Sequence, residues 1–98
     1  MVTVTLSPSP VRTKKWRVVS PWYTVDFGGR GYSDYTIHKD PARRLRYIQR
    51  HKKTEDWSDP ATAGFWARWL LWEKPSLRSA MAFVSKKLRV KVRRSQSP

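Results

Sequence analysis

The chain has 98 residues, which is enough for one domain with a single hydrophobic core and excludes a large multi-layered enzyme. Its 21 Lys and Arg residues outnumber seven Asp and Glu, and 13% of the residues are aromatic. The aromatic content excludes a wholly disordered chain, so we expect a folded centre with a core built largely from aromatic rings. No Cys is present, which excludes disulfides and thiol chemistry and fits a reducing compartment.

Residues 1–13 are rich in Ser, Thr and Pro and are expected to form an extended tail. Within them VTVTL (Val2 to Leu6) alternates, as in a short strand or in an arm that pairs with the sheet edge of a partner. The N-terminus lacks the pattern of a signal peptide. No uncharged stretch approaches the roughly 20 residues needed to cross a bilayer.

Two runs rich in β-branched and aromatic residues follow, KKWRVVS (Lys14 to Ser20) and WYTVDF (Trp22 to Phe27). They predict a two-stranded hairpin with one apolar face. GGRG (Gly28 to Gly31) then ends the second strand. Its glycines could bring backbone N–H groups to a phosphate, but neither phosphate-loop pattern is present, and a turn is the simpler interpretation.

Asp40-Pro41 predicts the start of a helix that runs from about Pro41 to Lys53. Leu45 and Ile48 form a narrow apolar stripe on this helix. The basic residues on its opposite side are Arg43, Arg46, Arg50 and Lys53. That side is either a solvated exterior or a contact surface for an anionic partner. We favour the contact, because no acid interrupts the surface.

The stretch TAGFWARWLLW falls in a second helix predicted from about Pro60 to Glu73. Its aromatic residues are Phe65, Trp66, Trp69 and Trp72. They could contact a membrane, stack nucleic-acid bases or fill the core. The helix is apolar nearly all round, with Arg68 as the only charge between Pro60 and Leu71, which is typical of a buried helix.

Ser76 predicts the start of a third helix with apolar residues at helical spacing, and RVKVRR after it predicts an extended basic tail. From Lys74 to Pro98 there are eight basic residues and no acid, which favours contact with a polyanion. The expected contact residues here are Lys86, Lys87, Arg89, Lys91, Arg93 and Arg94.

Candidates for catalysis and metal binding are weak. The potential metal ligands are His38, His51, Asp34 and Asp40, but they lack ligand spacing on one helical face. Glu55 and Asp56 are adjacent carboxylates that would point in different directions on a helix. We therefore expect no catalytic residue, no cofactor and no metal site.

These patterns predict an α+β fold in which a short N-terminal β-hairpin packs on about three helices and extended basic tails lie at both ends. The expected organisation is an N-terminal tail at residues 1–13, one small domain at 14–88 and a basic C-terminal tail at 89–98.

The blocks GYSDYTIHKDPARRLRYIQRHKKTEDW and TAGFWARWLLWEKPSL resemble a family of small basic proteins of large nucleocytoplasmic DNA viruses, the giant viruses and their algal relatives. The similarity spans roughly residues 27–83 and depends chiefly on two sequence motifs, RHKK…W and TAGFW.RWLLW…P. The family consists mainly of uncharacterised virion or hypothetical proteins. The resemblance therefore implies a virion component and brings no catalytic role.

We accordingly expect a non-enzymatic structural protein of the virion, made in the host cytoplasm: a minor capsid protein that bridges capsid subunits on the inner side of an icosahedral shell. The expected partners are other capsid proteins, with viral DNA or the anionic inner-membrane surface as alternatives, and no small-molecule substrate. The alternative function is a sequence-nonspecific nucleic-acid-binding protein that helps package the genome through phosphate contacts.

Overall fold

The predicted hairpin is present in the computed structural model, which describes residues 1–96. Its strands are β2 (Lys14–Val19) and β3 (Thr24–Gly29), and they pair antiparallel with Val18 opposite Val25. Apolar side chains recur at every second position of these strands and so share one face. Both valines are buried on that face, which forms part of the core.

The N-terminal segment corrects the prediction of an extended tail at residues 1–13. Thr3–Pro8 form strand β1, which lies inside a four-stranded sheet of order β3-β2-β1-β4. The alternation of VTVTL places Val4 and Leu6 on the apolar face, where they are 1% and 0% exposed. The strand interpretation is therefore correct, and the strand pairs with the chain's own sheet.

The C-terminal segment corrects the other predicted tail, at residues 89–98. Lys91–Arg94 form β4, an edge strand that runs parallel to β1 with Val92 beside Val4. Val92 is partly buried against the core, and this apolar contact gives the basic segment a fixed position. Residues 97 and 98 of the predicted tail lie outside the described residues.

The glycine-rich segment GGRG ends strand β3, as predicted: Gly28 and Gly29 are the last residues of the strand, and Arg30 and Gly31 lie in the turn that follows. Gly28 and Gly31 have φ angles of 78° and 92°, in the left-handed region that glycine adopts without strain. The backbone N–H of Tyr32 donates to the carbonyl oxygen of Gly29 at 3.2 Å, and this bond closes the turn.

Helix α2 (Pro41–His51) begins as the sequence predicts and ends two residues before the predicted Lys53. The carboxylate of Asp40 accepts a hydrogen bond of 2.9 Å from the backbone N–H of Ala42. A short helix that the pattern did not predict, α1 (Tyr35–His38), precedes it and is capped by Asp34.

The Trp-rich helix is shorter and less regular than predicted. α3 (Ala63–Trp66) starts after Thr62 and continues as a π-helical turn, η1 (Ala67–Leu71). Asp59-Pro60 does not start the helix, because the carboxylate of Asp59 accepts a bond only from the N–H of Ala61, in a separate turn. The Pro60 carbonyl oxygen instead accepts a hydrogen bond of 2.6 Å from the indole N–H of Trp66.

The third predicted helix is confirmed as α4 (Leu77–Leu88). Ser76 caps it by accepting a hydrogen bond of 3.1 Å from the backbone N–H of Ser79. Arg89, with a φ angle of 55°, ends the helix in the left-handed region, and the chain then enters β4.

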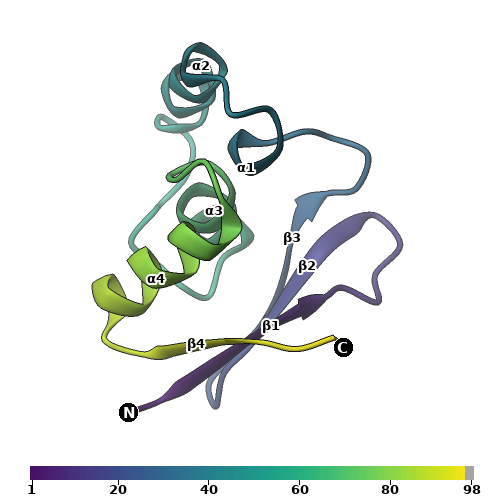
Figure 1. Ribbon diagram of the computed structural model, residues 1–98, viewed down its shortest axis with the longest axis vertical. Helices are drawn as coiled ribbons and strands as arrows, with labels where there is room; N and C mark the ends of the chain where they lie inside the picture. Colours follow the sequence, from purple (N-terminus) through teal and green to yellow (C-terminus); the bar gives the residue numbers. More distant parts are fainter. Residues whose placement is uncertain (97–98) are drawn as a thin grey trace.

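The helices lie on one side of the sheet, so the predicted α+β architecture is confirmed (Figure 1). The segments α3, η1 and α4 contact the strands of the sheet. Helix α2 lies at the opposite end of the molecule from β4, beside α1. The two ends of the structure therefore present different basic segments.

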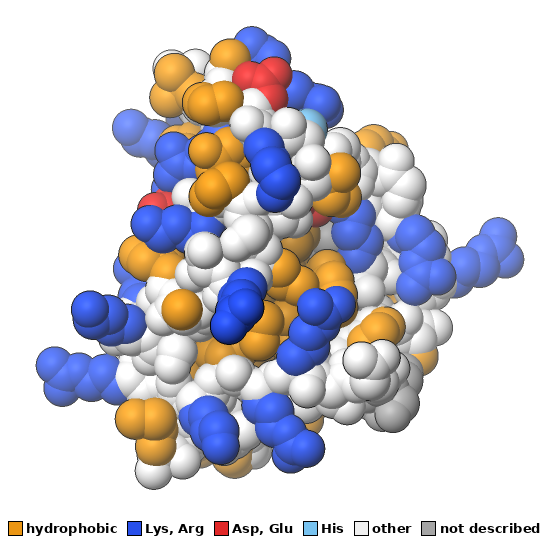
Figure 2. Space-filling model, viewed as in Figure 1, with side chains coloured by type: hydrophobic (Ala, Val, Ile, Leu, Met, Phe, Trp, Pro, Cys, Tyr) orange, Lys and Arg blue, Asp and Glu red, His pale blue; other side chains and the backbone are white. Residues whose placement is uncertain are grey.

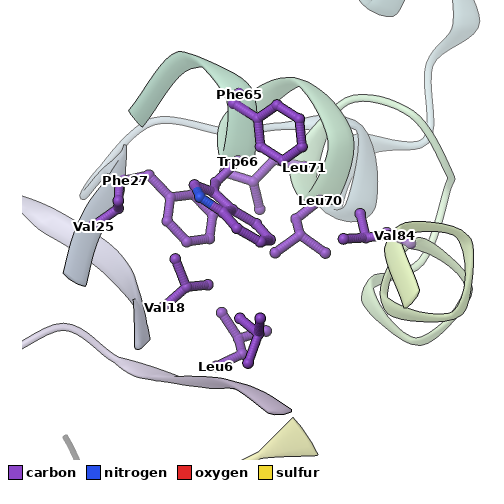
Figure 3. Packing of buried hydrophobic residues seen from close by; sticks show 11 residues of the cluster. Leu6, Val18, Val25, Phe27, Phe65, Trp66, Leu70, Leu71 and Val84 are labelled. Atoms are coloured by element: carbon purple, nitrogen blue, oxygen red, sulfur yellow. The ribbon is translucent and has the colours of Figure 1, made fainter. Parts of the chain in front are cut away.

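Trp66 lies at the centre of the core, between sheet residues such as Phe27 and helix residues such as Leu70 (Figure 3). Of the four aromatics predicted to be core residues, Phe65 and Trp66 are buried, with 1% and 0% exposed. The prediction is only partly correct for Trp69 and Trp72, which are partly buried and pack against the edge of this cluster.

Candidate functional site

One face of α2 holds the helix against the rest of the protein. The Tyr47 ring stacks on Trp72, with ring centroids 4.2 Å apart and planes 2° apart, and Tyr47 is 7% exposed. The second contact is Arg44, whose Nε donates to the backbone carbonyl oxygen of Trp72 at 2.8 Å. The predicted apolar stripe is wrong for Leu45, which is 54% exposed, because positions 44, 47 and 51 form the docked face of the helix.

Arg44 also belongs to a three-residue ionic network. The Glu73 carboxylate accepts hydrogen bonds from Arg44 at 2.8 Å and from Arg68 at 2.7 Å. Burial would raise the pKa of Glu73, but the bonds from the two arginines outweigh it and the pKa lies below its ordinary value. Arg68 is only 8% exposed and lies over the Trp69 ring at 4.3 Å, so the carboxylate compensates a buried charge.

The predicted basic face of α2 lies on the exposed side of the helix, and we name it the α2 surface. All its members are exposed and none forms an ion pair within residues 1–96. The α2 surface consists of Arg43, Arg46, Arg50 and Lys53, the last of which lies in the turn after the helix.

The second predicted cluster lies at the end of α4 and on β4, and we name it the β4 surface. Its members are exposed and consist of Lys86, Lys87, Arg89, Lys91, Arg93 and Arg94. Lys87 Nζ lies 4.2 Å from the centroid of the Trp69 ring, and the Arg94 guanidinium lies 5.1 Å from that of Trp16. These cation–π contacts orient two of the charges while leaving them accessible.

The two surfaces are separated by the fold. Helix α2 and strand β4 lie at opposite ends of the ribbon in Figure 1. Lys and Arg side chains occur over the whole of the face in Figure 2, and Asp and Glu are visible at only a few points. The protein thus presents positive charge in more than one direction.

The acidic residues are all engaged by groups of the protein itself. Those that contact basic side chains are Asp26, Asp34, Glu55 and Glu73. Those that accept backbone N–H bonds at a helix or turn are Asp40, Asp56 and Asp59. Of the 21 Lys and Arg residues, only four form ion pairs within residues 1–96: Lys15, Arg17, Arg44 and Arg68. Most cations therefore have no acidic partner in the part of the chain that the structure describes.

A cavity of about 430 Å³ lies between α2, the end of the β2–β3 hairpin and the α3–η1 segment. Arg43 and Arg50 of the α2 surface line it together with Lys14. The stacked rings of Tyr47 and Trp72 form another part of its wall. The sequence pattern did not predict this cavity, because its walls come from segments that are distant in the chain.

The candidate metal ligands do not come together. Among residues 1–96, no group of three His, Cys, Asp or Glu side chains is placed to hold a metal ion. Nδ1 of His38 accepts the backbone N–H of Asp40 at 2.9 Å, and burial together with the charge of Arg43 lowers the pKa of His38. His51 contacts Glu55 instead.

None of the helices in residues 1–96 has the length and apolar character needed to cross a membrane.

Fold and surface chemistry define this chain as a small α+β protein with two cationic surfaces. Over residues 4–51, from β1 to the end of α2, the chain is similar to a family of unknown function (DUF5754). No curated protein and no solved structure matches the chain.

Proposed function

We propose that the protein is a non-enzymatic architectural protein that bridges anionic partners, and specifically a minor capsid protein on the inner side of an icosahedral DNA-virus shell. The observation that supports this proposal is the surplus of exposed cations whose possible internal counterions are all engaged elsewhere. Such a surplus attracts a polyanion over several ångströms, and this attraction weakens as the ionic strength rises.

The separation of the α2 and β4 surfaces supports bridging. A protein with principal extents of 34 × 28 × 24 Å and basic groups at opposite ends can contact two partners at once. When both contacts form on one assembly, the second is effectively intramolecular and raises the avidity. The sheet and core provide a rigid spacer between the two contacts.

The assignment to a virion depends on the sequence resemblance, and the chemistry of the surfaces supports only an anionic partner. Acidic faces of capsid subunits, lipid headgroups and DNA all meet that requirement. We favour capsid subunits, because the resemblance is to virion proteins.

One experiment tests the two surfaces with matched changes of charge. The variant Arg46→Glu/Lys53→Glu alters the α2 surface, and Lys86→Glu/Arg93→Glu alters the β4 surface. Each should reduce cosedimentation with protein shells stripped of DNA and lipid. The control, Arg12→Glu/Arg78→Glu, has the same change of charge at exposed residues outside both surfaces and should bind as the parent does. Equal binding by the parent and both surface variants would refute the bridging proposal.

Nucleic-acid packaging is the second candidate, and it is favoured by the large number of exposed arginines and lysines without an ordered acidic partner. Contacts with phosphates release counterions, so the logarithm of the DNA affinity should fall linearly with the logarithm of the salt concentration. Steep salt dependence on duplex DNA, together with no binding to stripped shells, would favour packaging over capsid bridging.

A further inference from the structure

The cavity beside α2 is large enough for a small ligand. Its volume of about 430 Å³ lies in the range of roughly 300–1,000 Å³ that is usual for ligand pockets. Small residues, among them Gly28, Gly29, Ala63, Gly64 and Ala67, form much of its wall. A ligand in this cavity would therefore lie beside the backbone and short side chains.

The ionisable groups of the cavity leave an excess of positive charge. Its two acids are engaged, because Asp34 pairs with Lys15 at 2.8 Å and Glu55 contacts His51. The three remaining cations of the wall have no acidic partner within residues 1–96. These cations are Lys14, Arg43 and Arg50. An acceptor-rich anion fits such a wall better than a neutral ligand does.

Tyr47 places a hydrogen-bond donor at the cavity. Tyr47 lines the cavity and is 7% exposed, with its ring held between Trp72 and His51. Its hydroxyl makes no hydrogen bond to any residue that the structure describes. Only His38 Nε2 and Arg68 Nε are fully buried side-chain atoms without a partner in the described residues, so the Tyr47 hydroxyl is open to solvent and free to donate to a bound acceptor.

An exposed aromatic ring lies at the same cavity. Tyr32 is 77% exposed and lines the cavity beside Gly29, where an added Cβ would lie 2.8 Å from Cδ2 of the tyrosine ring. Exposed rings with neighbouring basic side chains are the usual platform on which proteins stack unpaired bases.

We propose that this cavity binds a nucleotide. Lys14, Arg43 and Arg50 hold its phosphate, the Tyr47 hydroxyl donates to a phosphate oxygen, and the base stacks on Tyr32. The nucleotide is either free or part of a single strand, since both offer the same phosphate and base. This site goes beyond the bridging function. It shares Arg43 and Arg50 with the α2 surface, but it also uses Lys14, Tyr32 and Tyr47 and needs neither Arg46 nor the β4 surface.

The test is a titration of the ¹⁵N-labelled full chain, followed by amide chemical shifts. Separate titrations use adenosine monophosphate, adenosine, and a five-nucleotide thymidine single strand. Saturable shifts are expected at Gly28, Gly29 and Gly64, with adenosine bound at least about tenfold more weakly than its monophosphate because the charged hydrogen bonds are missing. The monophosphate and the single strand distinguish the two sources: the one that binds more tightly identifies the form of nucleotide recognised.

Two variants separate recognition from folding. Tyr47→Phe keeps the stacked ring and should weaken the better-bound nucleotide about tenfold, and Lys14→Gln should do so by a similar factor. Arg46→Gln is the control and should stay within about twofold, since its charge lies outside the cavity and is screened. The variant Arg46→Glu/Lys53→Glu tests bridging separately: it should lose binding to the stripped shells and still bind the nucleotide.

Any of three results would overturn the nucleotide site. Adenosine could bind as tightly as its monophosphate, shifts could be confined to the β4 surface, or Tyr47→Phe and Lys14→Gln could both bind as the parent does.

Discussion

The rings of Tyr47 and Trp72 lie face to face, with centroids 4.2 Å apart and planes 2° apart, and they join α2 to the residue that follows η1. Tyr47 belongs to the segment that is similar to the family of unknown function, and Trp72 lies outside it. The helix that carries the α2 surface thus depends on packing against a part of the chain that the similarity does not cover. This contact therefore supports both the bridging surface and the proposed nucleotide site.

Replacing Trp72 by Ala should lower the free energy of unfolding by about 3 kcal/mol, because it removes a large stacked ring from a partly buried contact. Urea unfolding followed by circular dichroism measures the change. Leu45→Ala on the same helix is the control, and it should cost no more than about 0.5 kcal/mol because its side chain is largely exposed. Equal losses in the two variants would contradict the docking of α2 through Tyr47.

The tryptophans of the second helix should differ in their effect on stability. Trp66→Ala should cost about 5 kcal/mol or unfold the protein, since the ring is 0% exposed at the centre of the core. Trp69→Ala should cost nearer about 2 kcal/mol, because the ring lies at the edge of the core and contacts Arg68 and Lys87. Thermal unfolding of the two variants gives the ranking, and a larger loss for Trp69 would be inconsistent with this core.

The N-terminal strand should be essential for stability. Leu6→Ala should lower the free energy of unfolding by about 2–5 kcal/mol, because Leu6 is 0% exposed on the inner strand β1. Thr3→Ala, at an exposed position of the same strand, should change it by less than about 0.5 kcal/mol. If residues 1–13 were a loose tail, chemical denaturation would give the same midpoint for both variants and the parent.

Local signals predict the elements whose ends are set by local hydrogen bonds. Asp40-Pro41 and Ser76 mark the starts of α2 and α4, because the capping side chain and the capped N–H groups are close in the sequence. The pairing of β1 with β4 is different, since it joins Thr3 to Lys91 near the other end of the chain. No local pattern specifies such a non-local pair, so the sequence alone predicts that VTVTL and RVKVRR belong to tails.

The exposed basic residues could be predicted because they follow from a helical face or a run of like charges. The residues that position them could not be predicted in the same way. In the sequence, Arg44 looks like one more solvent-exposed charge, and only the structure shows that it contacts Glu73 and the Trp72 carbonyl oxygen. One available signal was Arg68, the only charge in an otherwise apolar stretch. A charge in that setting requires a buried partner, and Glu73 at the end of the same stretch supplies it.

The network around Glu73 also predicts how stability depends on pH. The pKa of Glu73 in the folded protein lies below its ordinary value of 4.5, so folding favours the ionised carboxylate. Its contribution to stability is therefore complete above pH 4.5 and is lost as the pH falls through the folded-state pKa. Glu73→Gln should reduce the free energy of unfolding at pH 7 by about 1–3 kcal/mol, because Arg68 and Arg44 lose a charged acceptor.

The same substitution should make the stability of the variant less dependent on pH than that of the parent below pH 4.5, since the group that titrates there has been removed. Urea unfolding of both proteins at a series of pH values between neutrality and strong acid measures the two curves. The expected result is that they lie apart near pH 7 and converge in acid, where the parent's Glu73 is protonated and no longer pairs with the arginines. Curves that remained parallel over the whole range would show that the carboxylate does not stabilise the fold through its charge.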